Sequence, residues 1–119
     1  MYKIENFDRR FIVGINRDIV ITHKSTVTLG RDELITIKDT SSNEYDVLCK
    51  DFGFYLTPSI NKRLSNNNFK LCIVRNESME YYILIVDKNK VSKFSDYCKQ
   101  ERLILVNWIT DLLLKNLEQ

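Results

Sequence analysis

The stretches FKLCIVR (Phe69–Arg75) and YYILIV (Tyr81–Val86), joined by the polar link NESME, decide the fold. Two apolar runs of strand length on either side of a short polar connection predict a β-hairpin. The second run lacks polar alternation, which predicts a central strand covered on both faces. The middle of the chain is therefore expected to form an antiparallel sheet.

Upstream of this hairpin, the chain reads as a series of short β-branched strands with polar breaks between them. The predicted strands are Phe11–Ile15, Asp18–Thr22, Thr26–Leu29, Glu33–Lys38 and Glu44–Lys50. A polar cluster between the last two strands, DTSSN, predicts a second hairpin. Because the strands are short and the turns are close, a barrel-like or strongly bent sheet also fits this half of the chain.

Downstream of the hairpin, the hydrophobic period becomes helical. Val91, Phe94 and Cys98 recur at helical spacing after Asn89, which suits an N-cap. Arg102–Val106 then predicts a strand, with a single helix from Arg102 onward as the alternative.

The last segment, NWITDLLLKNLEQ, predicts a second helix that continues to Gln119. Its apolar stripe comprises Trp108, Ile109, Leu112, Leu113 and Leu117. Leu114 would extend this stripe toward solvent, so a homodimer contact through the C-terminal helix is expected at Leu113, Leu114 and Leu117.

These patterns together predict an α+β fold, with a mostly antiparallel sheet of short strands and two C-terminal helices. A length of 119 residues suits a single domain over residues 1–119. No apolar run approaches the roughly 20 residues that span a bilayer, and Glu5 and Asp8 stand where a signal peptide would be apolar. We therefore expect a soluble cytoplasmic protein that does not enter a membrane.

Residue types needed for several common chemistries are scarce. The single histidine, His23, lies in a polar link between two predicted strands, and the three cysteines contain no C-x-x-C pair. Nucleophilic catalysis needs a base beside the nucleophile, and a zinc site needs several His or Cys ligands. The sequence accordingly predicts no metal site and no cofactor, and it predicts reduced cysteines in the core.

Charge is distributed unevenly along the chain. The net charge is only +2, but the segment between Asp51 and Glu77 contains no acidic residue. Its four basic residues are Lys62, Arg63, Lys70 and Arg75. This local excess predicts a site for an anion.

Within that basic segment, TPSINKRL carries a helix-start pattern. Thr57 would be the N-cap and Pro58 would occupy the first helical position, where its missing N–H is harmless. The free N–H groups at such a helix start favour anions. The candidate ligand-binding residues are Tyr55, Thr57, Ser59, Asn61, Lys62, Arg63, Lys70 and Arg75.

Three functions compete on this sequence. The first is a small non-catalytic binding or accessory domain that recognises an anionic small molecule or a protein partner through residues 52–75. The second is a small enzyme using Asp51, Tyr55, Ser59 and Arg63 as acid–base and electrostatic groups. The third is a weak binder of single-stranded nucleic acid that stacks bases on Tyr55 and Phe69, which the low net charge disfavours.

Overall fold

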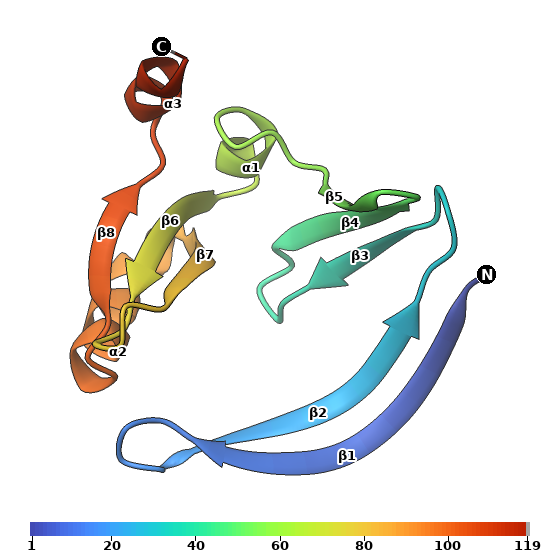
Figure 1. Ribbon diagram of the computed structural model, residues 1–119, viewed down its shortest axis with the longest axis horizontal. Helices are drawn as coiled ribbons and strands as arrows, with labels where there is room; N and C mark the ends of the chain where they lie inside the picture. Colours follow the sequence, from blue (N-terminus) through green and yellow to red (C-terminus); the bar gives the residue numbers. More distant parts are fainter. Residues whose placement is uncertain (119) are drawn as a thin grey trace. The chain divides into compact units, whose positions relative to one another are not determined.

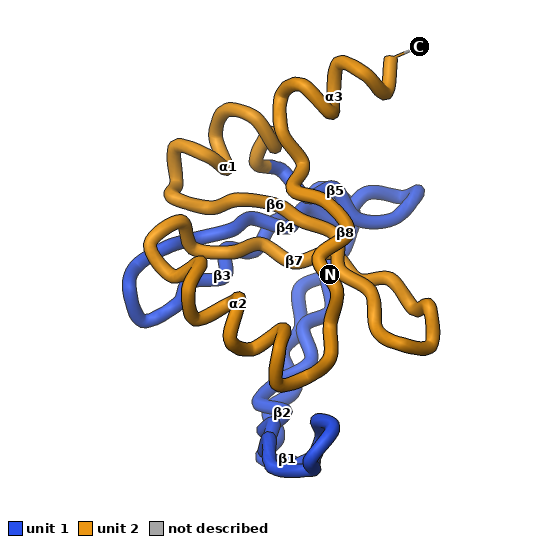
Figure 2. The backbone as a smooth tube through the Cα atoms, turned by 90° about the vertical axis from the view of Figure 1, so that its left-hand side faces the viewer, with its two compact units in different colours: residues 1–57 blue, residues 58–119 orange. Residues whose placement is uncertain are grey.

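A computed structural model describes residues 1–118 of the chain. The strands form antiparallel sheets, and two short helices lie in the C-terminal third, so the predicted α+β class is confirmed (Figure 1). The chain divides into two compact units, Met1–Thr57 and Pro58–Gln119, which are coloured separately in Figure 2. The single-domain assignment stays a prediction, and each unit is described by itself.

The first unit begins with a long hairpin of β1 (Lys3–Val13) and β2 (Ile19–Thr28). Both strands are longer than predicted, because cross-strand pairing extends over polar residues. It lengthens β1, and it joins the predicted strands Asp18–Thr22 and Thr26–Leu29 into the single strand β2. Gly14 opens the connecting turn with a φ of 97°, a left-handed conformation that glycine adopts without strain. His23 therefore lies inside β2 rather than in a link between strands.

A second sheet of this unit has the order β3-β4-β5, with strands Leu34–Lys38, Glu44–Lys50 and Gly53–Leu56. The predicted hairpin between β3 and β4 is confirmed, and the Asp39 carboxylate closes it by accepting the backbone N–H groups of Ser41 (2.9 Å) and Asn43 (3.0 Å). Within residues 1–57 the strands pair as two separate sheets, so the barrel-like alternative is wrong.

The second unit is built on a three-stranded sheet of order β7-β6-β8, with strands Tyr81–Asp87, Phe69–Arg75 and Ile104–Trp108. The predicted hairpin is confirmed as β6 and β7. The central strand, however, is β6, because β8 pairs with its other side. YYILIV is an edge strand, and Ile83 on it is 67% exposed, so its predicted coverage on both faces is wrong.

Helix α2 (Val91–Gln100) covers one face of this sheet and closes the core of the unit. Cys72, Val74 and Val86 are buried there, and Val91, Phe94 and Trp108 pack against them. The predicted apolar face of this helix is thus confirmed. Asn89 is not its N-cap, because Asn89 lies in a 3-10 turn, η1 (Lys88–Lys90), where its N–H donates to the Asp87 carboxylate (2.8 Å).

Helix α1 spans only Arg63–Asn66, so the predicted helix start at Thr57 and Pro58 is wrong. The hydroxyl of Ser59 accepts the N–H of Arg63 (2.9 Å), and the carbonyl of Ser59 accepts the N–H of Leu64 (2.9 Å). The N–H groups of Arg63 and Leu64 at the observed helix start are thereby satisfied within the chain. Leu64, 2% exposed, is the buried residue of α1.

At the C-terminus, β8 confirms a strand where Arg102–Val106 was predicted, although it continues through Trp108. Helix α3 spans Asp111–Leu117, and the Thr110 hydroxyl caps it by accepting the N–H of Leu113 (3.2 Å). Leu113 and Leu114 are half-buried, whereas Leu112 and Leu117 are exposed, so Leu114 is not the outward leucine. Gln119, included in the predicted helix, lies outside the described residues.

Candidate functional site

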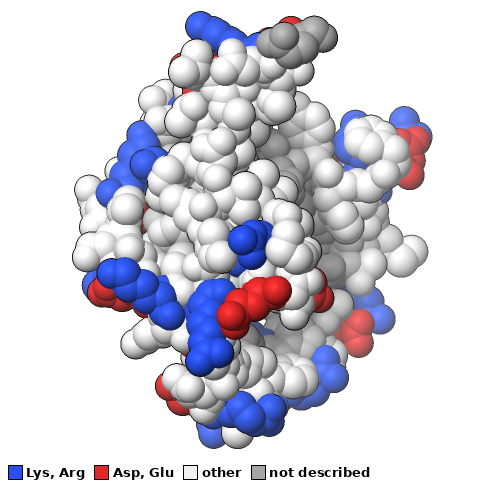
Figure 3. Space-filling view, turned by 60° about the vertical axis from the view of Figure 1, so that its left-hand side comes forward, with Lys and Arg blue, Asp and Glu red and all other residues white. Residues whose placement is uncertain are grey.

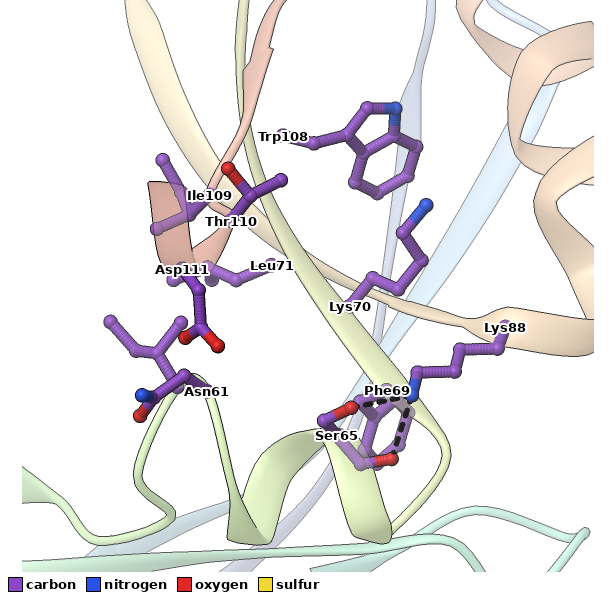
Figure 4. A pocket seen from close by; sticks show the side chains of 11 residues that line it. Asn61, Ser65, Phe69, Lys70, Leu71, Lys88, Trp108, Ile109, Thr110 and Asp111 are labelled. Carbon is purple, nitrogen blue, oxygen red and sulfur yellow. Dashed lines mark hydrogen bonds between the residues drawn. The ribbon is translucent and has the colours of Figure 1, made fainter. Parts of the chain in front are cut away.

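A pocket of about 270 Å³ opens in the second unit where α1, β6, β8 and the start of α3 meet (Figure 4). Its polar and aromatic side chains come from eight positions: Asn61, Ser65, Phe69, Lys70, Lys88, Trp108, Thr110 and Asp111. Ile60, Leu71 and Ile109 supply apolar wall. This volume lies just below the roughly 300–1,000 Å³ that is typical for drug-sized ligands, so the pocket suits a smaller molecule.

Lys70 carries the first charge of the pocket. Residues two apart on a strand share a face, so Lys70 lies on the same face of β6 as Cys72, which pairs with Trp108 of β8. The Lys70 ammonium consequently lies 4.0 Å from the centroid of the Trp108 ring, a cation–π contact (Figure 4). Within residues 1–118 this ammonium forms no ion pair.

Trp108 is held in place by its neighbours. Its ring also meets that of Phe94 edge-on, with centroids 5.7 Å apart and an angle of 61° between the planes. Lys70 and Phe94 both contact the indole of Trp108. The indole therefore positions the Lys70 side chain, and its ring is not left free for a ligand to stack on. Trp108 is the only tryptophan of the chain, so its fluorescence reports directly on this pocket.

Lys88 supplies the second positive charge. Its ammonium donates to the Ser65 carbonyl (2.9 Å) and to the Ser65 hydroxyl (2.5 Å), as the dashed lines of Figure 4 show. These bonds tie η1 to α1 and hold the charge at the pocket wall. An ammonium has three N–H donors, so one remains for a ligand or water.

Asp111 brings the only acidic side chain to the pocket lining. It is the first residue of α3, and its carboxylate points toward Asn61 in Figure 4, whereas Lys70 points toward Trp108. In the described part of the chain, Asp111 has no ion pair, and the Asn61 amide has no hydrogen bond. The pocket thus contains two cations, one anion and one uncommitted amide.

Two of the eight predicted ligand-binding residues, Asn61 and Lys70, line the pocket. The other six are found elsewhere: Tyr55, Thr57, Ser59, Lys62, Arg63 and Arg75. Tyr55 and Thr57 belong to the first unit, and the N–H of Thr57 donates to Asp46. The hydroxyl of Ser59 accepts the N–H of Arg63, the first residue of α1, as described above.

The remaining three predicted residues are basic. Lys62 and Arg63 are exposed at the start of α1. Arg75 lies at the far end of β6 and donates to the carbonyl of Asn76 (3.3 Å). None of these three lines the pocket.

Sequence reasoning missed Ser65, Lys88, Trp108 and Asp111. One signal was present for the last two. Thr110 followed by Asp111 is a helix N-cap followed by a first-turn acid, which places the helix start after Trp108 and leaves Trp108 on the preceding strand.

Other reactive side chains of the described residues have structural partners. His23 accepts from Arg9 at Nδ1 (2.7 Å), lies 3.1 Å through Nε2 from the carbonyl of Ser25, and stacks on Phe7. Burial raises the pKa of the Cys72 thiol and that of the Cys98 thiol. Across residues 1–118, no group of three or more His, Cys, Asp or Glu could hold a metal ion, and the three cysteines are unpaired.

Comparisons of the chain with protein-family models, curated protein sequences and solved structures return no significant match. Within the described residues, none of the helices has the length and apolar character needed to cross a membrane. The function must therefore be argued from the pocket itself.

Proposed function

We propose that the chain is a non-catalytic binding or accessory domain that holds a small anionic molecule in the pocket of its second unit. The Lys70 ammonium carries this proposal, because it lies in the pocket, is fixed against Trp108 and lacks an acidic partner within residues 1–118. A bound anion would supply that partner. The third N–H of Lys88 would add a hydrogen bond.

A nucleic-acid partner is less well supported. Phe69, one of the two aromatics expected to stack bases, is only 9% exposed and cannot receive a base. On the face drawn in Figure 3, basic side chains form small groups mixed with acidic ones and separated by uncharged surface. Nucleic-acid binding typically uses basic side chains clustered in a patch or stripe.

An enzymatic role gains no particular support from the four residues predicted for it. Asp51 and Tyr55 belong to the first unit, and the hydroxyl of Ser59 accepts the N–H of Arg63 in the second. This bond engages the serine in the local structure of α1.

Calorimetric titration of acetate and of inorganic phosphate at constant ionic strength tests the proposal. At least one of these anions is expected to bind saturably, and Lys70→Ala is expected to weaken binding about tenfold, the size of one charge-assisted hydrogen bond. Lys62→Ala is the matched control, because Lys62 is an exposed lysine of the same segment outside the pocket. Absence of saturable binding by the unmodified chain, or equal affinity in the Lys70 variant, would overturn the proposal.

A further inference from the structure

The pocket contains opposite charges that are not paired with each other. Lys70 and Asp111 both line it, and within residues 1–118 neither forms an ion pair. A simple anion site would gain nothing from Asp111, since a carboxylate in the lining repels an anion. As a first-turn acid Asp111 favours the start of α3, and from its place in the pocket lining it can also meet a positively charged group of a ligand.

Local structure fixes the two charges at separate places. Lys70 is held against the Trp108 ring, and Asp111 is held in the first turn of α3 by the Thr110 cap. In Figure 4 the ammonium points toward Trp108, and the carboxylate points toward Asn61. This separation of opposite charges matches a ligand that carries one charge at each end.

The wall beside these charges is apolar. Leu71 and Ile109 line the pocket, and their backbones are already joined by the Ile109 N–H donating to the Leu71 carbonyl (2.9 Å). Their side chains, with Ile60, thus offer alkyl surface without unsatisfied backbone groups. A short hydrocarbon spacer fits such a wall.

We infer that the ligand is a small zwitterion, an aminocarboxylate whose carboxylate meets Lys70 and whose protonated amine meets Asp111 and the Asn61 carbonyl oxygen. This inference rests on the proposed function and narrows it from anions in general to one chemical class. The pocket volume of about 270 Å³ suits a molecule of this size.

Three aminocarboxylates and two single-charge controls test this inference by calorimetry at pH 7. Glycine, β-alanine and γ-aminobutyrate vary the distance between the charges, butyrate lacks the amine, and n-butylamine lacks the carboxylate. At least one aminocarboxylate is expected to bind about tenfold more tightly than butyrate, because the amine adds one charge-assisted contact at an exposed acid. Asp111→Asn should abolish the tighter binding of the aminocarboxylate and leave the affinity for butyrate no weaker. The control is Asp96→Asn, because Asp96 is an exposed acid on α2 outside the pocket; this variant should change neither affinity.

The outcomes separate the two proposals. If butyrate binds as tightly as every aminocarboxylate, or if Asp111→Asn keeps the gain, the zwitterion is overturned and the anion site stands. If neither the carboxylates nor inorganic phosphate binds, both proposals fall. The comparison of ligands on the unmodified chain needs no variant, so a misfolded variant cannot obscure the result.

Discussion

Substitution of Val74 by alanine measures how much the core of the second unit depends on its central strand. Val74 is 0% exposed on β6 and belongs to the buried cluster against which Trp108 packs. The substitution removes two methyl groups, and burial contributes about 0.8 kcal/mol for each such group. The cavity left behind adds to this, so the free energy of unfolding should fall by about 2–3 kcal/mol.

Equilibrium unfolding in urea, followed by Trp108 fluorescence, gives this quantity directly. Val106→Ala is the matched control, because Val106 is the bulged residue of β8 in the same sheet and is 47% exposed. The Val106→Ala variant should lose less than about 1 kcal/mol of unfolding free energy, since roughly half of the Val106 side chain already contacts water and no closed cavity forms. Equal losses in the two variants would refute the assignment of the core.

Three further predictions follow from contacts described above. Ser59→Ala removes the acceptor for the Arg63 N–H and should lower the free energy of unfolding, measured in urea, by about 1 kcal/mol; no measurable loss would contradict a stabilising role for this hydrogen bond. Because Cys72 is buried and burial raises the pKa of its thiol, Ellman's reagent should label half-buried Cys49 first, and equal labelling rates would contradict this. The same shift predicts that the free energy of unfolding is full below about pH 8.5 and declines as pH rises further, since the thiol of the unfolded chain ionises first. Leu112 is 68% exposed, so Leu112→Glu should change the free energy of unfolding by less than about 0.5 kcal/mol, and a larger loss would place Leu112 in the core. Sedimentation of the unmodified chain and of this variant tests self-association through α3.

Local patterns predicted most strands, because a strand's alternation and its flanking turn residues are visible in sequence. Phe69–Arg75 was predicted with its observed bounds, and the β3–β4 hairpin followed from its polar turn. The number of neighbours that a strand acquires is not visible in this way. YYILIV was therefore assigned to the centre of the sheet, although β8 pairs with β6 instead.

The candidate site was harder to predict because it depends on distant pairing. Lys70 was found through local charge and Asn61 through the helix-start segment, whereas Trp108 reaches Lys70 only because β8 pairs with β6. The helix-start pattern at Thr57 and Pro58 misled for a different reason. Ser59 offers both a hydroxyl and a carbonyl to the following N–H groups, and that local arrangement displaced the helix to Arg63.

The position of β6 between β7 and β8 has a consequence for the order of folding. Cys72 pairs with Leu84, 12 positions away, and with Trp108, 36 positions away. Closing the longer loop loses more chain entropy, so we expect the β6–β7 hairpin to form first and β8 to dock later. The pocket would then be completed only in the last step, and refolding followed by Trp108 fluorescence should lag behind the recovery of strand signal in circular dichroism.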